Sequence, residues 1–285
     1  MPDCKNPASH RILTSASLPA MKYAFLGAGK MASAIIRGML RANVCGPEDI
    51  MAACPEPELL ASLSRETSAR AAASNSEAAA SASAVFLCVK PADVRAAVAQ
   101  AGSALDGKLL VSIAAGVPLA SLSAIAPGAR IIRAMPNAAA IVARSATAYA
   151  CDPSATPDDR SLAEAVFSGI GAVFPVEEKL LNAVTGLSGS GPAYIALVIE
   201  ALSDGGVACG LSRKLALDLA VQTVLGTAIL AAETSEHPAV LREMVTSPAG
   251  TTIAGLRQLE AHGVRSAFLE AVAAGTERAQ ELSGT

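Results

Sequence analysis

Short apolar runs alternate with helical segments along the first half of the chain, from Met21 onward. The predicted strands are Tyr23 to Leu26, Ile50 to Ala53, Val85 to Val89, Leu109 to Ile113 and Ile131 to Ala134. The predicted helices between them are Met31 to Arg41, Glu56 to Ser64, Ala92 to Ala101 and Leu119 to Ile125. This alternation is typical of βαβ units and predicts a parallel sheet.

The strand pattern stops near residue 176. Its last elements are a strand at Ser145 to Ala150, a helix near Asp158 to Ser168 and a strand near Ala172 to Val176. From about Leu180 the chain is helical, with predicted breaks at Gly205-Gly206, His237-Pro238, Ser247 to Gly250 and His262-Gly263. We therefore predict an α/β nucleotide-type domain over residues 21–176 and an all-α domain over residues 177–285.

One predicted helix begins near Pro192 and is apolar on every face. Ser190 suits its N-cap, Pro192 its first turn, and Gly205-Gly206 its end. A helix of this kind is buried on all sides, so it indicates a larger bundle or a dimer core.

Composition and charge narrow the possible functions. A net charge of -3 and a pI of about 5.7 give no basic surface for nucleic acid. The six cysteines are scattered without a C-x-x-C, and His237 and His262 lack neighbouring ligands, so we expect no metal site. The cysteines are expected to be free thiols in a reducing cytoplasm.

Two uncharged stretches could be considered as membrane spans, Leu109 to Ala129 and Leu180 to Ile199. Prolines interrupt the first and a Ser-Gly-Ser-Gly-Pro run interrupts the second, so we expect buried core or interface instead. Residues 1–20 have no apolar targeting core and are expected to be a disordered extension, or to lie upstream of a start at Met21.

A glycine-rich turn directly follows the first predicted strand. Gly27-Ala28-Gly29-Lys30-Met31-Ala32 has the form G-x-G-x-x-A and leads into a helix. Gly27 would permit the tight turn, Gly29 the approach of a pyrophosphate, and Ala32 close packing of the helix on the strand. The position between a strand and a helix predicts a dinucleotide site, with the helix N-terminus facing the phosphates.

The residues at the end of the second predicted strand do not decide between NAD and NADP as the cofactor. An NAD site usually has an acidic residue there, and an NADP site a nearby arginine. Ala53-Cys54-Pro55-Glu56 supplies neither at the strand end. Glu56 could reach a ribose hydroxyl or could be an ordinary first-turn residue of the next helix.

A second informative loop, Ser247-Pro248-Ala249-Gly250-Thr251-Thr252, leads straight into a predicted helix. Free amides and hydroxyls at a helix start are suited to a carboxylate. Simple N-capping by one hydroxyl explains the same residues nearly as well.

The segment Val184-Thr185-Gly186-Leu187-Ser188-Gly189-Ser190-Gly191-Pro192-Ala193-Tyr194, together with the Ser247 to Thr252 loop, resembles the signature of pyrroline-5-carboxylate reductases. The similarity runs from Met21 to about Leu282 and includes Val89-Lys90-Pro91, Ala114-Ala115-Gly116 and Met135-Pro136-Asn137. It implies a Rossmann-like domain followed by an all-α dimerisation domain. It also implies reduction of 1-pyrroline-5-carboxylate to L-proline with NADPH, or NADH, by a homodimer or decamer whose active site two subunits share.

The resemblance also implies roles for particular residues. The cofactor would contact Leu26, Gly27, Ala28, Gly29, Lys30 and Met31 at its pyrophosphate, Cys54, Glu56 and Asn75 at its adenosine ribose, and Val89, Lys90 and Ala115 beyond. The substrate would contact Ser247, Gly250, Thr251, Thr252 and Glu178. We expect Thr252 to be the catalytic residue, hydrogen-bonded to the ring nitrogen. A cyclic iminium is already electrophilic, so no strong general acid is required.

One position departs from the family pattern, which usually has two glycines before its threonines. Here the pair is Ala249-Gly250, and Ala249 would be strained if its φ were positive.

Three other functions remain as alternatives. A 3-hydroxyacid dehydrogenase shares the domain plan but relies on a lysine in the interdomain helix, and no lysine occurs from Leu180 to Ala208. A reductase of a related cyclic imine would keep both motifs. A non-catalytic NADP(H)-binding redox sensor would need the glycine turn but not the threonine loop.

Overall fold

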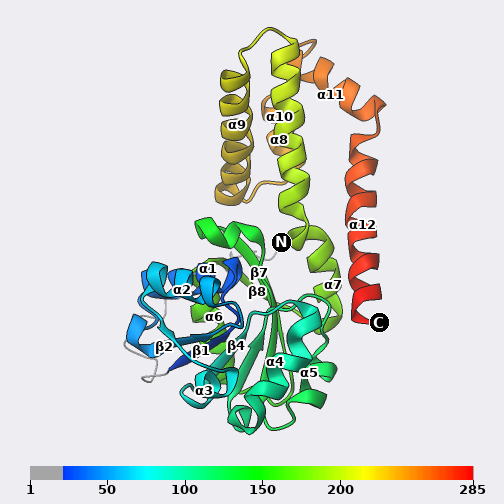
Figure 1. Cartoon of the computed structure of the whole chain (residues 1–285). Coiled ribbons are helices and arrows are strands. Elements are labelled where there is room, and N and C mark those ends of the chain that lie inside the picture. Colours follow the sequence, from blue (N-terminus) through cyan, green and yellow to red (C-terminus); the bar gives the residue numbers. More distant parts are fainter. Residues whose placement is uncertain (1–21, 285) are drawn as a thin grey trace. The chain divides into compact units, whose positions relative to one another are not determined.

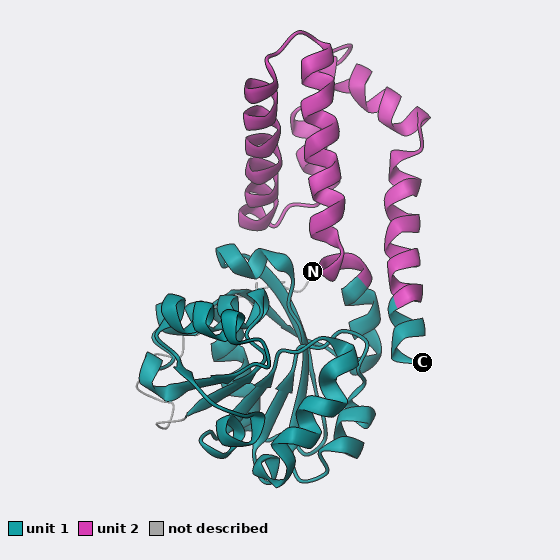
Figure 2. Cartoon of the chain, in the orientation of Figure 1, with its two compact units in different colours: residues 1–185, 279–285 teal, residues 186–278 magenta. Residues whose placement is uncertain are grey.

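The computed structural model describes residues 22–284 and divides the chain into two compact units (Figures 1 and 2). Unit 1 contains residues 1–185 and 279–285, and unit 2 contains residues 186–278. The expectation of a disordered extension at residues 1–20 lies outside the described residues.

Unit 1 is built on an eight-stranded sheet with the order β3-β2-β1-β4-β5-β6-β7-β8. The strands are β1 (Tyr23–Leu26), β2 (Ile50–Ala53), β3 (Arg70–Ala71), β4 (Ala84–Leu87), β5 (Leu109–Ser112), β6 (Arg130–Met135), β7 (Ser145–Cys151) and β8 (Gly171–Pro175). The helices are α1 (Lys30–Arg41), α2 (Pro57–Thr67), α3 (Asn75–Ala80), α4 (Val94–Ala101), α5 (Leu119–Ile125), α6 (Pro157–Ser168) and α7 (Leu181–Val184). The α/β class predicted for this part of the chain is therefore confirmed.

The sheet separates two layers of buried side chains. On one face Tyr23 and Phe25 contribute to a cluster with α1 and α6, and Phe25 stacks on Phe86 at 4.9 Å between ring centroids. On the other face Ala24 and Leu26 belong to a second cluster with α3, α4 and α5. Because β1 is covered on both faces, its sequence is apolar without alternation.

The sheet is parallel as predicted except at one pair. Strands β6 and β7 are antiparallel, with Met135 opposite Ala148. The connection between them contains only a 3-10 turn, Ala138–Val142, and it is too short for the crossover that parallel strands need. Strand β3 and helix α3 were not predicted, because β3 is a two-residue exposed strand and α3 is a short alanine-rich helix.

Unit 2 is helical throughout its described length. It contains α8 (Gly191–Ala208), α9 (Arg213–Thr234), α10 (Pro238–Met244), α11 (Thr251–Ala261) and most of α12 (Val264–Ser283). The predicted breaks at His237-Pro238, Ser247 to Gly250 and His262-Gly263 are confirmed.

The predicted break at Gly205-Gly206 is wrong, because α8 continues to Ala208. Gly206 lies where α8 meets α9, and a Cβ there would be 3.1 Å from the Cβ of Ala216. Gly206 therefore allows close packing of α8 on α9, whereas a Cβ at Gly205 would meet nothing within 4 Å. Ser190 does occupy the N-cap position, but its side chain makes no capping hydrogen bond.

The apolar helices of unit 2 are not buried within one chain. In α8, Ile195 is 45% exposed and Leu197 is 66% exposed, so of the two settings predicted for this helix, a larger bundle or a dimer core, a single chain does not provide the first. Among residues 22–284, α9 is the one helix long and apolar enough to span a membrane by length and composition. Leu215, Leu219 and Leu225 of α9 are exposed as well.

A partly buried ion pair connects the start of β6 to α6. Arg130 Nε lies 2.6 Å from Asp159 Oδ2, and the Asp159 side chain is 5% exposed. Asp159 also closes a capping box with Thr156, whose backbone N donates to Asp159 Oδ2 at 2.9 Å. Burial alone would raise the pKa of Asp159, but hydrogen bonds from Arg130 and Thr156 lower it overall.

Asp159→Asn should therefore lower the free energy of unfolding by about 2 kcal/mol at neutral pH, because it weakens the charge-assisted hydrogen bonds from Arg130 and Thr156. Since the folded pKa of Asp159 is lowered, its contribution is complete above the unfolded pKa of about 4 and is lost as pH falls through the folded pKa. Urea unfolding at pH 7 and at acid pH measures both effects. The exposed neighbour provides a control, Asp158→Asn, and an equal loss in both variants would contradict this account.

Candidate functional site

The predicted cofactor residues lie at one edge of the sheet. Gly27, Cys54, Val89 and Ala115 follow the carboxyl ends of β1, β2, β4 and β5, respectively. Parallel strands place these ends at the same edge, and β1 has β2 on one side and β4 on the other. Open α/β sheets bind ligands at such a reversal of strand order.

The two positions in the turn require glycine for different physical reasons. Gly27 has φ +106°, and a Cβ there would be 2.7 Å from the carbonyl oxygen of Cys88, so the fold itself requires glycine. Gly29 has an ordinary φ of -74°, and a Cβ there would meet nothing within 4 Å. The chain therefore has no internal reason for Gly29, whereas a phosphate approaching the backbone would require it.

Helix α1 begins directly after this open position. Its N-cap, Gly29, supplies no side-chain hydrogen bond to the first-turn amides. Ala32 is buried at 1% exposure under the turn, as its predicted packing role requires. Free amides and the positive end of the helix dipole can therefore hold a pyrophosphate.

A cavity of 390 Å³ opens beside the turn, between α1 and α2. Lys30, Ser33 and Arg37 line it from α1, and Ser62 and Glu66 from α2. Glu66 accepts hydrogen bonds from Ser33 Oγ at 3.0 Å and Ser62 Oγ at 3.1 Å, which lower its pKa. The hydroxyls of Ser33 and Ser62 are thus both hydrogen-bonded to the carboxylate of Glu66.

The residues predicted at the adenosine ribose have different hydrogen-bond partners within the chain. Glu56 is the N-cap of α2, outside the helix, and its Oε2 accepts a hydrogen bond from Cys54 Sγ at 3.0 Å. Burial and this contact raise the pKa of the Cys54 thiol. Asn75 is buried, and its Nδ2 donates to Gln100 Oε1 at 2.9 Å. A ribose contact from Asn75 would therefore use its carbonyl oxygen or its backbone.

Beyond β4, Val89 and Lys90 lead into a 3-10 turn, Pro91–Asp93. Lys90 is the N-cap of that turn, its side chain is exposed, and it follows the carboxyl end of β4.

Glu178 lies in unit 1 and already has two partners. Its Oε1 accepts a hydrogen bond from the backbone N of Leu119 at 2.6 Å and lies 3.1 Å from Arg133 Nη1. Sequence analysis missed Arg133, although an arginine within the apolar run Ile131-Ile132-Arg133-Ala134 is itself a signal.

The Ser247 to Thr252 loop, predicted to bind the substrate, lies in unit 2 and leads into α11. Ala249 has φ +55°, so the positive φ considered from the sequence is present at this alanine. A Cβ at Gly250 would overlap Ser247 Oγ. Gly250 is the N-cap of α11 without a side-chain hydrogen bond, which leaves the amides of Thr251 and Thr252 without a cap from the loop. This arrangement favours the carboxylate-site interpretation over simple N-capping.

The signature segment has a structural role that its sequence did not indicate. Thr185–Gly189 forms a π-helical turn, and a Cβ at Gly186 would lie 2.7 Å from the carbonyl oxygen of Val272 in α12. Tyr194 Oη donates to the carbonyl oxygen of Ala271 at 3.2 Å. The segment therefore joins α8 to α12.

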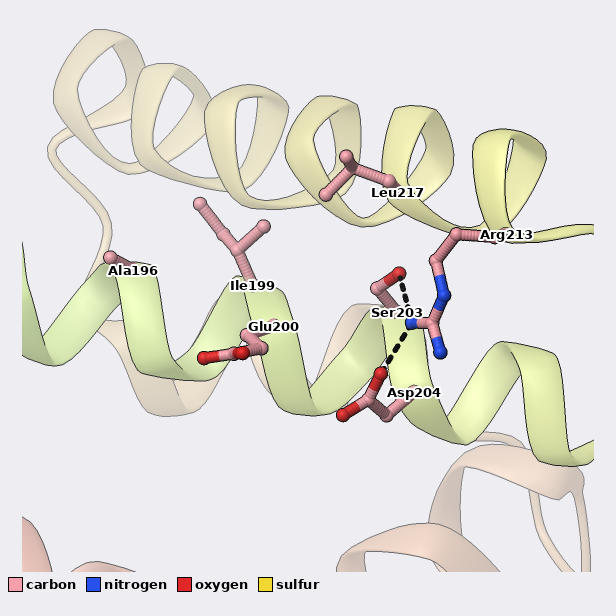
Figure 3. Close-up of a pocket in the computed structure, with 7 residues that line it drawn as sticks. All are labelled: Ala196, Ile199, Glu200, Ser203, Asp204, Arg213 and Leu217. Atoms are coloured by element: carbon pink, nitrogen blue, oxygen red, sulfur yellow. Dashed lines mark hydrogen bonds and ion pairs between the residues drawn. The ribbon is translucent and has the colours of Figure 1, made fainter.

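A second cavity, of 450 Å³, lies between α8 and α9 (Figure 3). Arg213 donates to Ser203 Oγ at 3.3 Å and to Asp204, and these contacts hold the end of α8 to the start of α9. Ile199 and Leu217 also line this cavity, so the cavity belongs to the apolar surface of the two helices. No group of three or more His, Cys, Asp or Glu lies together as a metal site in the described part of the chain.

The sheet topology and the open glycine turn define a dinucleotide-binding oxidoreductase with a helical second domain. Residues 178–282 match the family model for pyrroline-5-carboxylate reductase dimerisation, and residues 22–116 match the model for coenzyme F420-dependent NADP oxidoreductases. The chain belongs to the pyrroline-5-carboxylate reductase family, as its sequence resemblance implied.

Relatives and solved structures match over nearly the whole chain. The pyrroline-5-carboxylate reductase of Methanosarcina acetivorans is 44% identical over 92% of this chain and 97% of its own, and that of Arabidopsis thaliana is 42% identical over 93% and 96%. The solved enzyme from Coxiella burnetii is 34% identical with a TM-score of 0.88, covering 94% of this chain and 100% of its own. The Plasmodium falciparum enzyme, solved with NADP bound, is 28% identical with a TM-score of 0.84 over 92% and 98%.

Gly29→Ala should fold with unchanged thermal stability, because its Cβ meets no protein atom, yet weaken dinucleotide binding at least about tenfold by occupying the phosphate position. Thermal unfolding and fluorescence titration with NADPH measure the two effects. Gly27→Ala provides the contrast, since it should destabilise the apo-protein. Wild-type affinity in Gly29→Ala would remove the turn from the cofactor site.

Gly250→Ala should force the Ser247 hydroxyl into another rotamer, because the added Cβ would overlap Ser247 Oγ, and should raise KM for a substrate bound at this loop. Gly255→Ala, within the same helix, adds a Cβ that meets nothing within 4 Å and should leave KM unchanged. Steady-state kinetics on both variants checks this contrast. Equal effects would show that α11 responds to any added side chain.

Proposed function

We propose that this chain reduces 1-pyrroline-5-carboxylate to L-proline by hydride transfer from NADPH, the last step of proline biosynthesis. The observation that carries the proposal is 44% identity to an enzyme of this name over 92% of the chain. The open glycine turn and the uncapped start of α11 supply a phosphate site and a carboxylate site that suit this reaction.

The proposed cofactor site uses the carboxyl edge of unit 1. Bound reduced nicotinamide supplies the hydride. The turn from Leu26 to Met31 would hold the pyrophosphate, Cys54, Glu56 and Asn75 would lie at the adenosine ribose, and Val89, Lys90 and Ala115 would line the remaining path. We propose NADPH, with NADH accepted, because a member of the family was solved with NADP bound. The β2 end itself has no arginine, and its acidic residue, Glu56, accepts a hydrogen bond from Cys54 Sγ.

The proposed substrate site uses the loop before α11. Backbone amides of Thr251 and Thr252, shaped by Ser247 and Gly250, would bind the ring carboxylate at the positive end of the helix dipole. Thr252 would hydrogen-bond the ring nitrogen while hydride adds to the imine carbon, and Glu178 would contact the ring. Orientation of two reactants is sufficient for catalysis here, because the cyclic iminium is already electrophilic.

We propose that the enzyme works in the cytoplasm as a homodimer, assembled into a decamer, with two subunits sharing each active site. Residues 21–176 would form the cofactor domain and residues 177–285 the dimerisation and substrate domain. The exposed apolar residues of α8 and α9 support this assembly, as does a largely apolar 590 Å³ cavity lined by Leu256, Leu259 and Phe268. A second subunit covering these helices would also account for an apolar α9 without a membrane.

The decisive experiment follows the absorbance of reduced nicotinamide when purified protein meets 1-pyrroline-5-carboxylate, with NADPH and NADH in parallel. Rapid oxidation with formation of proline supports the proposal and ranks the two cofactors. A six-membered cyclic imine in the same assay tests whether Ala249, at its positive φ, has changed the preferred ring. Tight NADPH binding without turnover of either imine would favour the sensor.

Thr252→Ala should lower kcat about 100-fold without changing thermal stability, because one hydrogen bond to the reacting ring is lost. The matched control is Thr246→Ala, whose hydroxyl donates to the carbonyl oxygen of Arg242 at 2.6 Å just beyond the end of α10. Steady-state kinetics and thermal unfolding separate the two roles. Wild-type turnover in Thr252→Ala would overturn the catalytic assignment.

A further inference from the structure

Arg133 is a buried arginine at the carboxyl half of β6, with its side chain 6% exposed. Its Nη1 lies 3.1 Å from Glu178 Oε1. A guanidinium loses most of its hydration when buried, so this carboxylate is the contact that compensates it. The position of Glu178 is therefore coupled to the presence of Arg133.

Glu178 passes this constraint to a loop. The same Oε1 accepts the backbone N–H of Leu119, at 2.6 Å, at the first residue of α5. The N-cap of α5 is Pro118, which offers no side-chain cap, so Glu178 supplies the cap from a distant part of the chain. An anionic group at a helix N-terminus is stabilised by the helix dipole as well.

The loop held in this way joins β5 to α5 and contains Ala115. Two hydrogen bonds hold the first part of this loop. Ile113 N donates to the carbonyl oxygen of Leu87 at 3.2 Å, and Ala114 N donates to Ser112 Oγ at 3.3 Å. At its middle, Gly116 has φ +72° and packs against Leu282, leaving little room for a Cβ. Glu178 fixes its far end, so residues 113–118 are held at three places.

We propose that Arg133 is a positioning residue for the cofactor: through Glu178 it holds the β5–α5 loop in the conformation that binds the dinucleotide. The inference rests on the proposed function, since Ala115 lines the cofactor only there. Arg133 contacts neither reactant and acts through the carboxylate. Its loss frees Glu178 and the start of α5 while the strand itself remains in the sheet.

Two variants of Arg133 and one control test this role. Arg133→Met removes the charge at similar size, and Arg133→Lys retains a cation. The control is Arg130→Met on the same strand, which breaks an arginine–carboxylate pair at the opposite end of β6. All three are assayed for NADPH affinity by fluorescence titration, for KM and kcat, and for thermal unfolding.

Arg133→Met should weaken NADPH binding about tenfold and lower kcat about 10- to 100-fold, with Arg133→Lys restoring most of both. Arg130→Met should lower the melting temperature at least as much but leave NADPH affinity unchanged. Equal changes of affinity in Arg130→Met and Arg133→Met, or a loss of stability alone in Arg133→Met, would overturn the proposal.

Amide hydrogen exchange tests the same proposal without measuring turnover, and it does not depend on Arg133→Met alone. In the apo-protein, exchange of the Leu119 amide should be faster in Arg133→Met, and slightly faster in Arg133→Lys, than in the wild type. If Arg133→Met does not fold, Arg133→Gln takes its place as the variant without the charge, and unchanged exchange at Leu119 together with unchanged NADPH affinity in Arg133→Gln would count against the inference. Wild-type protein that binds NADPH but reduces no imine would refute the proposed function alone, because the affinity comparison remains valid.

Discussion

The close approach of two backbones at the carboxyl ends of β1 and β4 is the constraint on which unit 1 depends. Gly27 lies so near the carbonyl of Cys88 that no side chain fits between them. The chain can then turn sharply from β1 into α1 while Gly27 N stays bonded to Ala53 O, at 2.8 Å, on the other side. Three strands are thus tied together at one point, and α1 begins above it with its amides directed outward.

This constraint explains why the cofactor half of the molecule could be predicted from its sequence. A separate physical reason accounts for the residue type at each of Gly27, Gly29 and Ala32. The order of strand, turn and helix is visible in the pattern of apolar residues. The same pattern could not give the direction of β7, because periodicity reports which residues are buried and not which way a strand runs. That direction follows from the length of the β6–β7 connection.

The substrate half was less accessible to sequence reasoning. The positive φ of Ala249 and the closeness of Gly250 to the Ser247 hydroxyl depend on the folded loop, and the residue types alone left capping and carboxylate binding nearly balanced. Arg133 and Glu178 were harder still, because they are 45 positions apart and the bond from Glu178 reaches a third segment at Leu119. Long-range ion pairs of this kind leave no local pattern, although a charged residue inside an apolar strand marks one end of them.

The π-helical turn at Thr185–Gly189 sets the rotational phase of the helix that follows it. A π turn contains one residue more than an α-helical turn, and each residue advances a helix by about 100°. Removing that residue would turn the side chains of α8 by about this angle relative to Gly186. Tyr194 would then point away from Ala271, and a different set of leucines and isoleucines would form the outer face of α8. The extra residue therefore selects which apolar face unit 2 presents.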